Sequence, residues 1–301
     1  MNYKLLSIKV PRDISQDKSE NNKKISEMIA SCDQMISNLN KFKYPIVFEI
    51  ASPIDTREIM FFVACHRKHI DMIQKMITAY FPFSEVIETS DYTVFGLKNY
   101  NGGAVGKLNT HFALPIKTYQ NFESDPFASI LNAFSKIGDN EGMALQLILN
   151  STSSEKKDIK KILENLKRGE KEKDVFNRKF VDISMVKETF NPFAKSDKDK
   201  KENEPKIVDE ALVKNVENKL LQPLFDVNLR LVVSSPDKSR VDDLIQEVKN
   251  GFTQLSSPVL NLIEFKKQQG SKLKTLIFQY VYRLLDSKTT MVLNSSEINS
   301  F

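Results

Sequence analysis

The segment spanning residues 115–150 most constrains how this 301-residue chain can fold. Its central part begins with Asp125-Pro126, and apolar side chains then recur on one helical face across residues 127–134. An uninterrupted apolar run, residues 143–149, follows a glycine-bracketed turn and has the length of a buried strand. Aspartate before proline is typical of a helix N-cap with proline at the first helical position. The segment therefore predicts a helix and then a strand, and we expect it to join two folded halves.

The chain before this segment predicts a mixed α+β arrangement. Alternating or continuous apolar runs indicate strands, and apolar residues at spacings of three and four indicate helices. A strand, a hairpin and a helix with a returning strand are parts of a ferredoxin-like unit. We expect an N-terminal α+β subdomain over residues 1–114. The expected strands are residues 4–10, 44–52, 57–65, 84–88, 92–96 and 104–114, and the expected helices are 19–39 and 67–81.

A second α+β subdomain is expected over residues 115–295. Residues 168–206 are dense in Lys, Glu, Asp and Asn, so we predict a mobile charged insertion there. The ending places Ser295 or Ser296 at a helix N-cap with Glu297 in the first turn, which favours a truncated following domain that starts at 296–301. The expected strands are 142–151, 225–234, 259–265 and 291–293, and the expected helices are 154–167, 208–221, 238–255 and 273–285.

The sequence NGGAVGKL, residues 101–108, superficially resembles a phosphate-binding loop. A Walker loop needs a first glycine and a hydroxyl residue after GK, and here Asn101 and Leu108 occupy those positions. The predicted flanking elements are two strands, where a Walker loop has a strand and then a helix. We interpret Asn101-Gly102-Gly103 as a hairpin turn and expect no ATP hydrolysis by this chain.

Histidine and cysteine are too scarce to predict an active site. The local arrangement Cys65, His66, His69, with His111 elsewhere, matches no common zinc spacing. We interpret His66 and His69 as exposed capping residues, and Cys65 and Cys32 as buried thiols in a reducing compartment. The two carboxylates Glu123 and Asp125 favour helix capping over acid–base catalysis. The sequence predicts no catalytic residue, no metal ligand and no cofactor.

Basic residues cluster on the predicted helix 154–167 and again within residues 198–201. A solvated helix face is the simplest interpretation, because 39 acidic residues dilute the 44 basic ones. A stand-alone nucleic-acid-binding module that uses the first cluster stays open as the alternative. The candidate residues for nucleic-acid binding are Lys156, Lys157, Lys160, Lys161, Lys167 and Arg168.

No run approaches the about 20 apolar residues that span a bilayer, so the sequence predicts a cytoplasmic protein.

Several stretches, in this order, resemble one family of proteins. They are LLSIKVPRD, FEIAS with EIMFFVAC, LPIKTYQNFESDPFASILNAFSKIGDNEGMALQLIL, VNLRLVVSSPDKSR, GFTQLSSPVLN and MVLNSSEINSF. Together they resemble the N-terminal, non-catalytic region of FtsK/HerA-like ATPases, the type IV secretion or conjugation coupling-protein-like proteins of candidate-phyla bacteria. The segment from Leu114 to Leu149 is the most specific part.

The resemblance implies a function without implying a catalytic residue. In such proteins a RecA-like ATPase domain follows a similar ending, a hexamer forms, and the assembly lies at the inner face of the cell membrane. We therefore expect a non-enzymatic assembly module of a DNA- or protein-translocating ATPase. Its expected partners are the ATPase domain of the same longer protein, other copies of the chain and, in the alternative, DNA.

Overall fold

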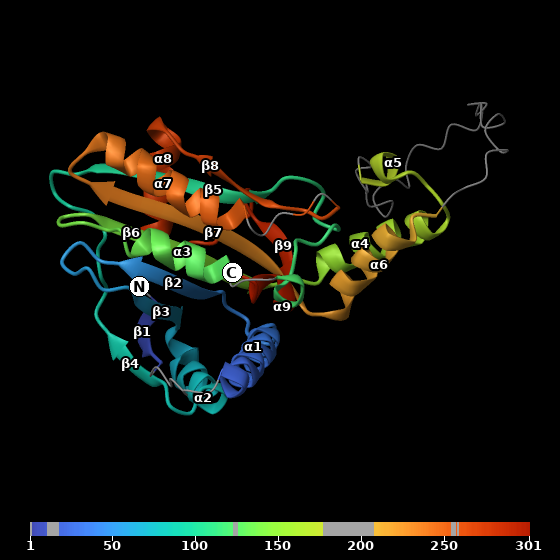
Figure 1. Ribbon diagram of the computed structural model, residues 1–301, viewed down its shortest axis with the longest axis horizontal. Coiled ribbons are helices and arrows are strands. Elements are labelled where there is room, and N and C mark those ends of the chain that lie inside the picture. Colours follow the sequence, from blue (N-terminus) through green and yellow to red (C-terminus); the bar gives the residue numbers. More distant parts are fainter. Residues whose placement is uncertain (1, 11–17, 123–125, 177–207, 254–256, 258) are drawn as a thin grey trace.

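The computed structural model describes residues 2–10, 18–122, 126–176, 208–253, 257 and 259–301. Its described strands form one nine-stranded antiparallel sheet with helices packed on it, so the expected α+β class is confirmed (Figure 1). The strand order is β4-β1-β3-β2-β6-β7-β5-β8, and β9 also pairs with β7. The strands are β1 (Tyr3–Lys9), β2 (Ile46–Ser52), β3 (Met60–His66), β4 (Glu85–Thr89), β5 (Tyr100–Leu108), β6 (Gly142–Ser151), β7 (Leu224–Ser235), β8 (Ile263–Lys267) and β9 (Met291–Asn294).

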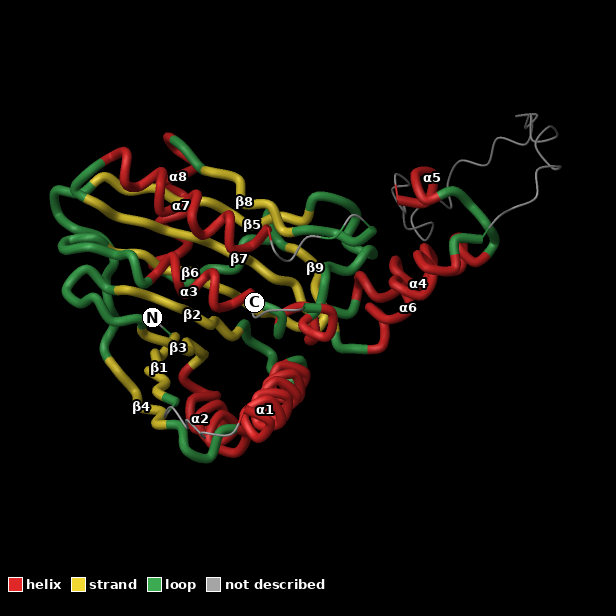
Figure 2. The backbone as a smooth tube through the Cα atoms, in the orientation of Figure 1, coloured by secondary structure: helices red, strands yellow, loops and turns green. Residues whose placement is uncertain are grey.

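Helices cover both faces of this sheet unequally. One face carries α1, α2, α3, α7 and α9 over the largest apolar core, and the opposite face carries α8 and residues 90–99 (Figure 2). A third apolar cluster joins α4 and α6, which project from the sheet as a pair (Figure 1). The helices are α1 (Lys18–Leu39), α2 (Ile70–Tyr80), α3 (Pro126–Phe134), α4 (Ser154–Lys167), α5 (Glu172–Phe176), α6 (Glu210–Leu221), α7 (Lys238–Thr253), α8 (Gly270–Val281) and α9 (Ser295–Ile298).

The sheet is continuous across the expected boundary between residues 114 and 115. β2 pairs with β6 in register, Ile46 opposite Leu149, so the predicted hairpin and the central segment share one sheet. β5, from the first half, lies between β7 and β8 of the second half. The helix and strand predicted for the central segment are present as α3 and β6. The Asp125 cap lies outside the described residues, as do Glu123 and residues 177–207 of the charged insertion.

The glycine pair predicted to form a hairpin turn lies instead inside a strand. β5 runs through Gly102 and Gly103 without a break. A Cβ at Gly102 would lie 2.3 Å from a methyl of Val241 in α7, and one at Gly103 would lie 2.8 Å from the backbone oxygen of Leu231. These glycines are therefore needed for close packing, and they do not form the hairpin turn that the sequence predicts.

Two further predictions are wrong in detail. Residues 92–96 and 109–114 are loops, and residues 92–96 form part of the layer on the α8 face. The last helix is capped by Asn294 and not by Ser295 or Ser296: Asn294 Oδ1 accepts from the Glu297 backbone N–H, and the Glu297 carboxylate accepts from the Asn294 N–H. Residues 295–298 are buried.

Candidate functional site

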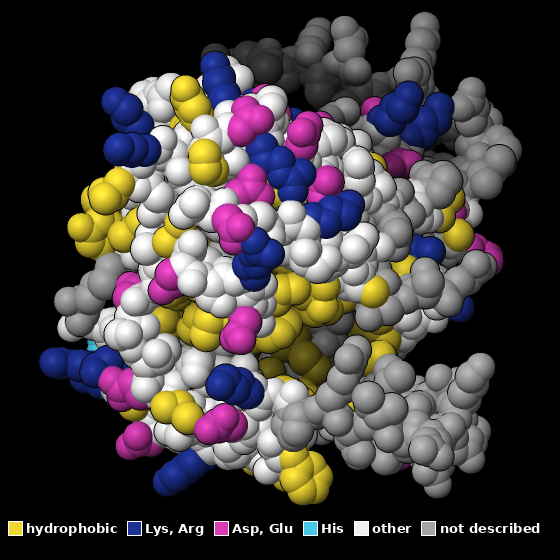
Figure 3. Space-filling model, turned by 60° about the vertical axis from the view of Figure 1, so that its left-hand side comes forward, with side chains coloured by type: hydrophobic (Ala, Val, Ile, Leu, Met, Phe, Trp, Pro, Cys, Tyr) yellow, Lys and Arg dark blue, Asp and Glu magenta, His cyan; other side chains and the backbone are white. Residues whose placement is uncertain are grey.

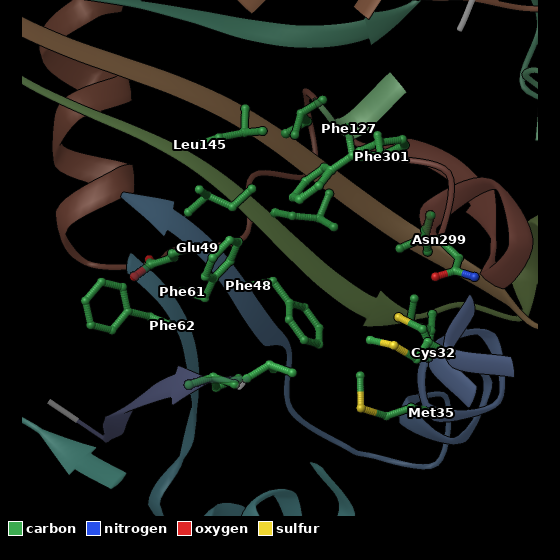
Figure 4. A pocket seen from close by; sticks show the side chains of 18 residues that line it. Cys32, Met35, Phe48, Glu49, Phe61, Phe62, Phe127, Leu145, Asn299 and Phe301 are labelled. Atoms are coloured by element: carbon green, nitrogen blue, oxygen red, sulfur yellow. The ribbon is translucent and has the colours of Figure 1, made fainter. Parts of the chain in front are cut away.

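An apolar cavity of about 440 Å³ lies on the α1 face of the sheet. Its floor is formed by central strands, and its walls come from α1, α3 and the α9 end (Figure 4). Alternation along β2 turns Phe48 and Ile50 toward this face, and the neighbouring strands do the same with Leu145, Leu147 and Leu229. The volume falls within the range of ligand pockets, about 300–1,000 Å³.

Phenylalanine side chains line the cavity together with aliphatic residues and methionines. Phe48, Phe61, Phe127 and Phe301 face the space from four different segments, and Figure 4 shows them arranged around it. The cavity opens to the surface, where Figure 3 shows a hollow lined with apolar side chains. Three lining residues keep large exposed fractions: Val10 at 52%, Met28 at 47% and Phe61 at 38%.

Cys32, Glu49 and Asn299 bring polar side-chain groups to the lining of this cavity. Burial, and to a smaller extent the charge of Asp33, raises the pKa of the Cys32 thiol to about 11, so the thiol is protonated at neutral pH. The Asn299 amide donates to the Ile29 backbone oxygen over 2.9 Å, which fixes the amide against the middle of α1. The cavity can therefore bind apolar groups.

The opposite face of the same strands carries a row of polar side chains. Glu49 of β2 stands directly opposite Gln146 of β6, and Gln146 stands opposite Arg230 of β7. The Gln146 amide donates to Glu49 over 2.7 Å and accepts from Arg230 over 3.0 Å. All three residues are at most 2% exposed, so the row is sealed beneath α8 and the segment after it.

Arg283, in the segment after α8, binds the Glu49 end of this row. Its guanidinium donates two bonds of 3.0 Å to Glu49 and bonds of 3.0 and 2.8 Å to Asp91. Burial acts to lower the pKa of Arg283, but the carboxylates of Asp91 and Glu49 outweigh it and raise the pKa. Arg283 has a φ of 52°, in the left-handed region that costs a non-glycine residue energy, and the four bonds hold it there.

Arg230 is held differently, because its hydrogen-bond partners are neutral. It donates to Gln146, Asn228 and the carbonyl oxygens of Gln279 and Leu284. Burial lowers the pKa of Arg230 to about 10, and Asp286 partly offsets this effect. Its Nε has no hydrogen-bond partner among the described residues. The network fastens the end of α8 and the chain after it to the sheet.

Two tyrosines complete the network. Tyr280 donates its hydroxyl to Tyr92 over 2.9 Å, and Tyr92 donates to Glu49 over 3.1 Å. Burial raises the pKa of both phenols, so both stay protonated at neutral pH. The sequence contained a signal for this network that we did not use: Glu49, Gln146 and Arg230 each lie between two apolar neighbours in a strand.

A second buried polar cluster fastens the projecting α4–α6 pair to the body. Lys219 of α6 and Glu297 of α9 are both fully buried, and the ammonium lies 3.0 Å from the carboxylate. Glu297 also accepts from the backbone N–H of Ile116 and of Asn294, and Lys219 donates to the Val292 carbonyl. Since both charges are surrounded by partners, this cluster is a structural joint.

The six basic residues predicted to bind nucleic acid all lie in or directly after α4, and all six are exposed. Ile159, Ile162 and Leu166 face the other way, into the third apolar cluster. Lys167 forms an ion pair with Glu217 of α6 over 2.5 Å. The structure thus places the predicted residues together on the projecting pair. The second basic cluster, within 198–201, lies outside the described residues.

The histidines and cysteines are dispersed over the fold. His66 is a capping residue, as predicted, since it accepts from the Lys68 N–H, but it is buried and stacks on Tyr44, so the prediction that it is exposed was wrong. Cys65 is buried, and Cys32 is partly buried. The described residues contain no group of three or more His, Cys, Asp or Glu placed to hold a metal ion.

These features define an α+β domain whose single sheet has an open apolar cavity on one face and a closed polar network on the other. The family model described as "Domain of unknown function (DUF8128)" matches residues 3–300, so the chain belongs to that family. A comparison with curated proteins gave no match. Among the described helices, none is long and apolar enough to cross a membrane.

Proposed function

We propose that this domain is a non-catalytic assembly module of a membrane-associated, type IV secretion-like ATPase that translocates DNA or protein. The observation that carries the proposal is the open apolar cavity of about 440 Å³ with Val10, Met28 and Phe61 exposed at its edge. Single exposed apolar residues are ordinary on soluble domains, whereas a contiguous apolar surface marks an interaction site. Aromatic residues and methionine are also enriched at protein interfaces.

The proposed occupant of the cavity is the RecA-like ATPase domain that the sequence resemblance implies after residue 301. Phe301 itself lines the cavity. The proposed contact therefore places the partner against a cavity that Phe301 and Phe61 both line. The sequence resemblance supports the identity of the partner, and the cavity supports the mode of contact.

The test is binding between the 301-residue chain and the segment that its gene encodes downstream, measured by calorimetry. We expect a downstream ATPase domain that binds, and we expect Phe61→Glu to weaken binding by about tenfold or more, because it places a charge in the apolar contact. Phe83→Glu is the matched control, since Phe83 is 84% exposed and does not line the cavity. A downstream segment without GxxxxGK[ST], or equal losses in the two variants, would contradict the proposal.

The non-catalytic part of the proposal has its own test. We expect the purified chain to hydrolyse no ATP above background, because the GK at residues 106–107 lies inside and near the end of a strand and lacks a following hydroxyl residue. Hydrolysis that disappears in Lys107→Ala would overturn this part while leaving the cavity contact standing.

A second candidate function, nucleic-acid binding through α4, is favoured by the joint exposure of its six basic residues. The expected result is oligonucleotide binding, followed by fluorescence anisotropy, that weakens as salt rises with a log–log slope of about −0.7 per phosphate contacted on a single strand. Lys156→Glu with Lys160→Glu should abolish it, and Lys238→Glu, at the start of α7, should not. Salt-independent binding or none at low ionic strength would eliminate this candidate.

A further inference from the structure

A notch interrupts one edge of β7. β5 pairs along residues 230–235 of β7, and β9 pairs along residues 224–227 of the same edge. The last β5 partner is Val105, opposite Arg230, and the last β9 partner is Met291, opposite Val227. Residues 228 and 229 therefore have no strand partner on that side. A depression of about 270 Å³ lies between the end of β5 and the start of β9.

The walls of this notch are basic and rich in hydroxyl groups. Lys107 comes from the end of β5, and Lys288 comes from the turn before β9. Thr110, His111, Phe112 and Thr290 are among the residues between them, and none of the described residues that line the notch has a carboxylate. We infer that this notch is a binding site for a phosphate group.

The two lysines are available for a ligand. Neither forms an ion pair with a described residue. Glu264 stands opposite Lys107 in the β5–β8 ladder, but its carboxylate lies 3.6 Å from the ammonium of Lys266. The Asp286 carboxylate accepts from the Lys288 backbone N–H and from the Thr289 hydroxyl, and not from the Lys288 ammonium. An anion between the two ammonium groups would meet two positive charges without a competing carboxylate in the wall.

His111 supplies a fixed, neutral donor. Its Nδ1 accepts from the Ala113 backbone N–H over 3.2 Å, so Nε2 carries the proton of the neutral ring. Burial lowers the pKa of His111, and Lys219 lowers it further while Asp158 opposes the effect. Stacking on Phe112 and on Phe176, with centroids 4.3 and 5.2 Å away, fixes the ring plane.

This combination favours phosphate over other anions. Two flexible ammonium groups, a ring N–H and the hydroxyl of Thr110 can surround a compact anion with several acceptor oxygens. A monocarboxylate offers two acceptor oxygens and half the charge of a phosphate dianion. The inference goes beyond the proposed function: the notch and the apolar cavity have no lining residue in common, so either can fail without the other.

The test is an amide ¹H–¹⁵N NMR titration of the 301-residue chain at constant ionic strength. Inorganic phosphate, a nucleoside monophosphate, a single-stranded oligonucleotide and acetate are added separately. We expect saturable shifts confined to residues 107–112 and 288–292 with the phosphate ligands and not with acetate. Lys107→Met and Lys288→Ala should each weaken binding by about tenfold, the loss of one charge-assisted contact. Lys238→Ala is the matched control and should bind as the parent does.

The arms of the titration identify where the phosphate comes from. Equal affinity for all three phosphate ligands assigns the notch to free phosphate, and tighter binding of the oligonucleotide assigns it to a nucleic-acid backbone. Lys288 is exposed, so Lys288→Ala tests the site even if Lys107→Met disturbs β5. Absence of saturable shifts at the notch, equal binding of acetate, or full affinity in both variants would overturn the inference.

Discussion

The two faces of the central strands are filled in opposite ways. On one face Glu49, Gln146 and Arg230 lie in register and are joined by hydrogen bonds of 2.7 to 3.0 Å. On the other face Phe48, the residue next to Glu49, borders a cavity of about 440 Å³. Directional hydrogen bonds fix the position of each polar side chain on the first face. Non-directional apolar contacts on the other face tolerate an unfilled space between side chains. The sealed face therefore fixes the fold, and the open face is available for binding.

The largest expected effect comes from breaking the sealed face. Glu49→Ala removes one of the two carboxylates from Arg283 and leaves the Gln146 amide with only the Tyr280 carbonyl as acceptor, so we expect a loss of about 3–5 kcal/mol in the free energy of unfolding. Urea denaturation measures it. Glu85→Ala, at an exposed position of the edge strand β4, should stay within about 0.5 kcal/mol. Equal effects of the two changes would mean that the network does not hold the fold together.

Truncation of a side chain to alanine on the open face should lower the free energy of unfolding less than truncation on the sealed face. Phe48→Ala enlarges a cavity that already exists and should cost about 1–2 kcal/mol, because the ring is only partly buried. Phe134→Ala removes a fully buried ring of α3 and should cost about 3–5 kcal/mol. Thermal and urea unfolding of both variants test the comparison. A loss at Phe48 as large as that at Phe134 would indicate that the cavity is packed tightly in solution.

Sequence reasoning predicted the elements of this fold better than it predicted their partners. Helical periodicity located α1, α3 and α4 because their apolar spacing depends on local geometry alone. The insertion of β5 between β7 and β8 could not be predicted, since long-range strand pairing leaves no local pattern. The glycines of β5 were assigned to a turn because their requirement comes from helices packed on both sides of the strand.

The candidate sites show the same limit. The basic cluster of α4 was found because neighbouring residues on one helix share a surface. The apolar cavity could not be found, because its lining comes from segments as far apart as Ile8 and Phe301. The polar row could have been predicted: a charged side chain between two apolar residues of a buried strand, as at Arg230, needs a buried partner.

The smallest expected effect concerns the end of the polar row on β7. Asp226 shares its strand face with Asn228 and Arg230, but burial, and then the charge of Glu155, raise its pKa to about 6. A carboxyl with a raised folded-state pKa binds more protons in the folded than in the unfolded state between about pH 4 and pH 6, so its contribution to stability falls as pH rises through that window.

Asp226→Asn removes this loss of stability at higher pH. The variant should be more stable than the parent at pH 7 by about 1 kcal/mol or less, because the side chain is only half-buried and solvent screens it. The two proteins should unfold alike near pH 4, and urea unfolding at both pH values measures the difference. If the parent gained stability relative to Asp226→Asn as pH rose from 4 to 7, Asp226 would be held as a stabilised carboxylate, and the polar row would extend one residue further along β7 than its hydrogen bonds indicate.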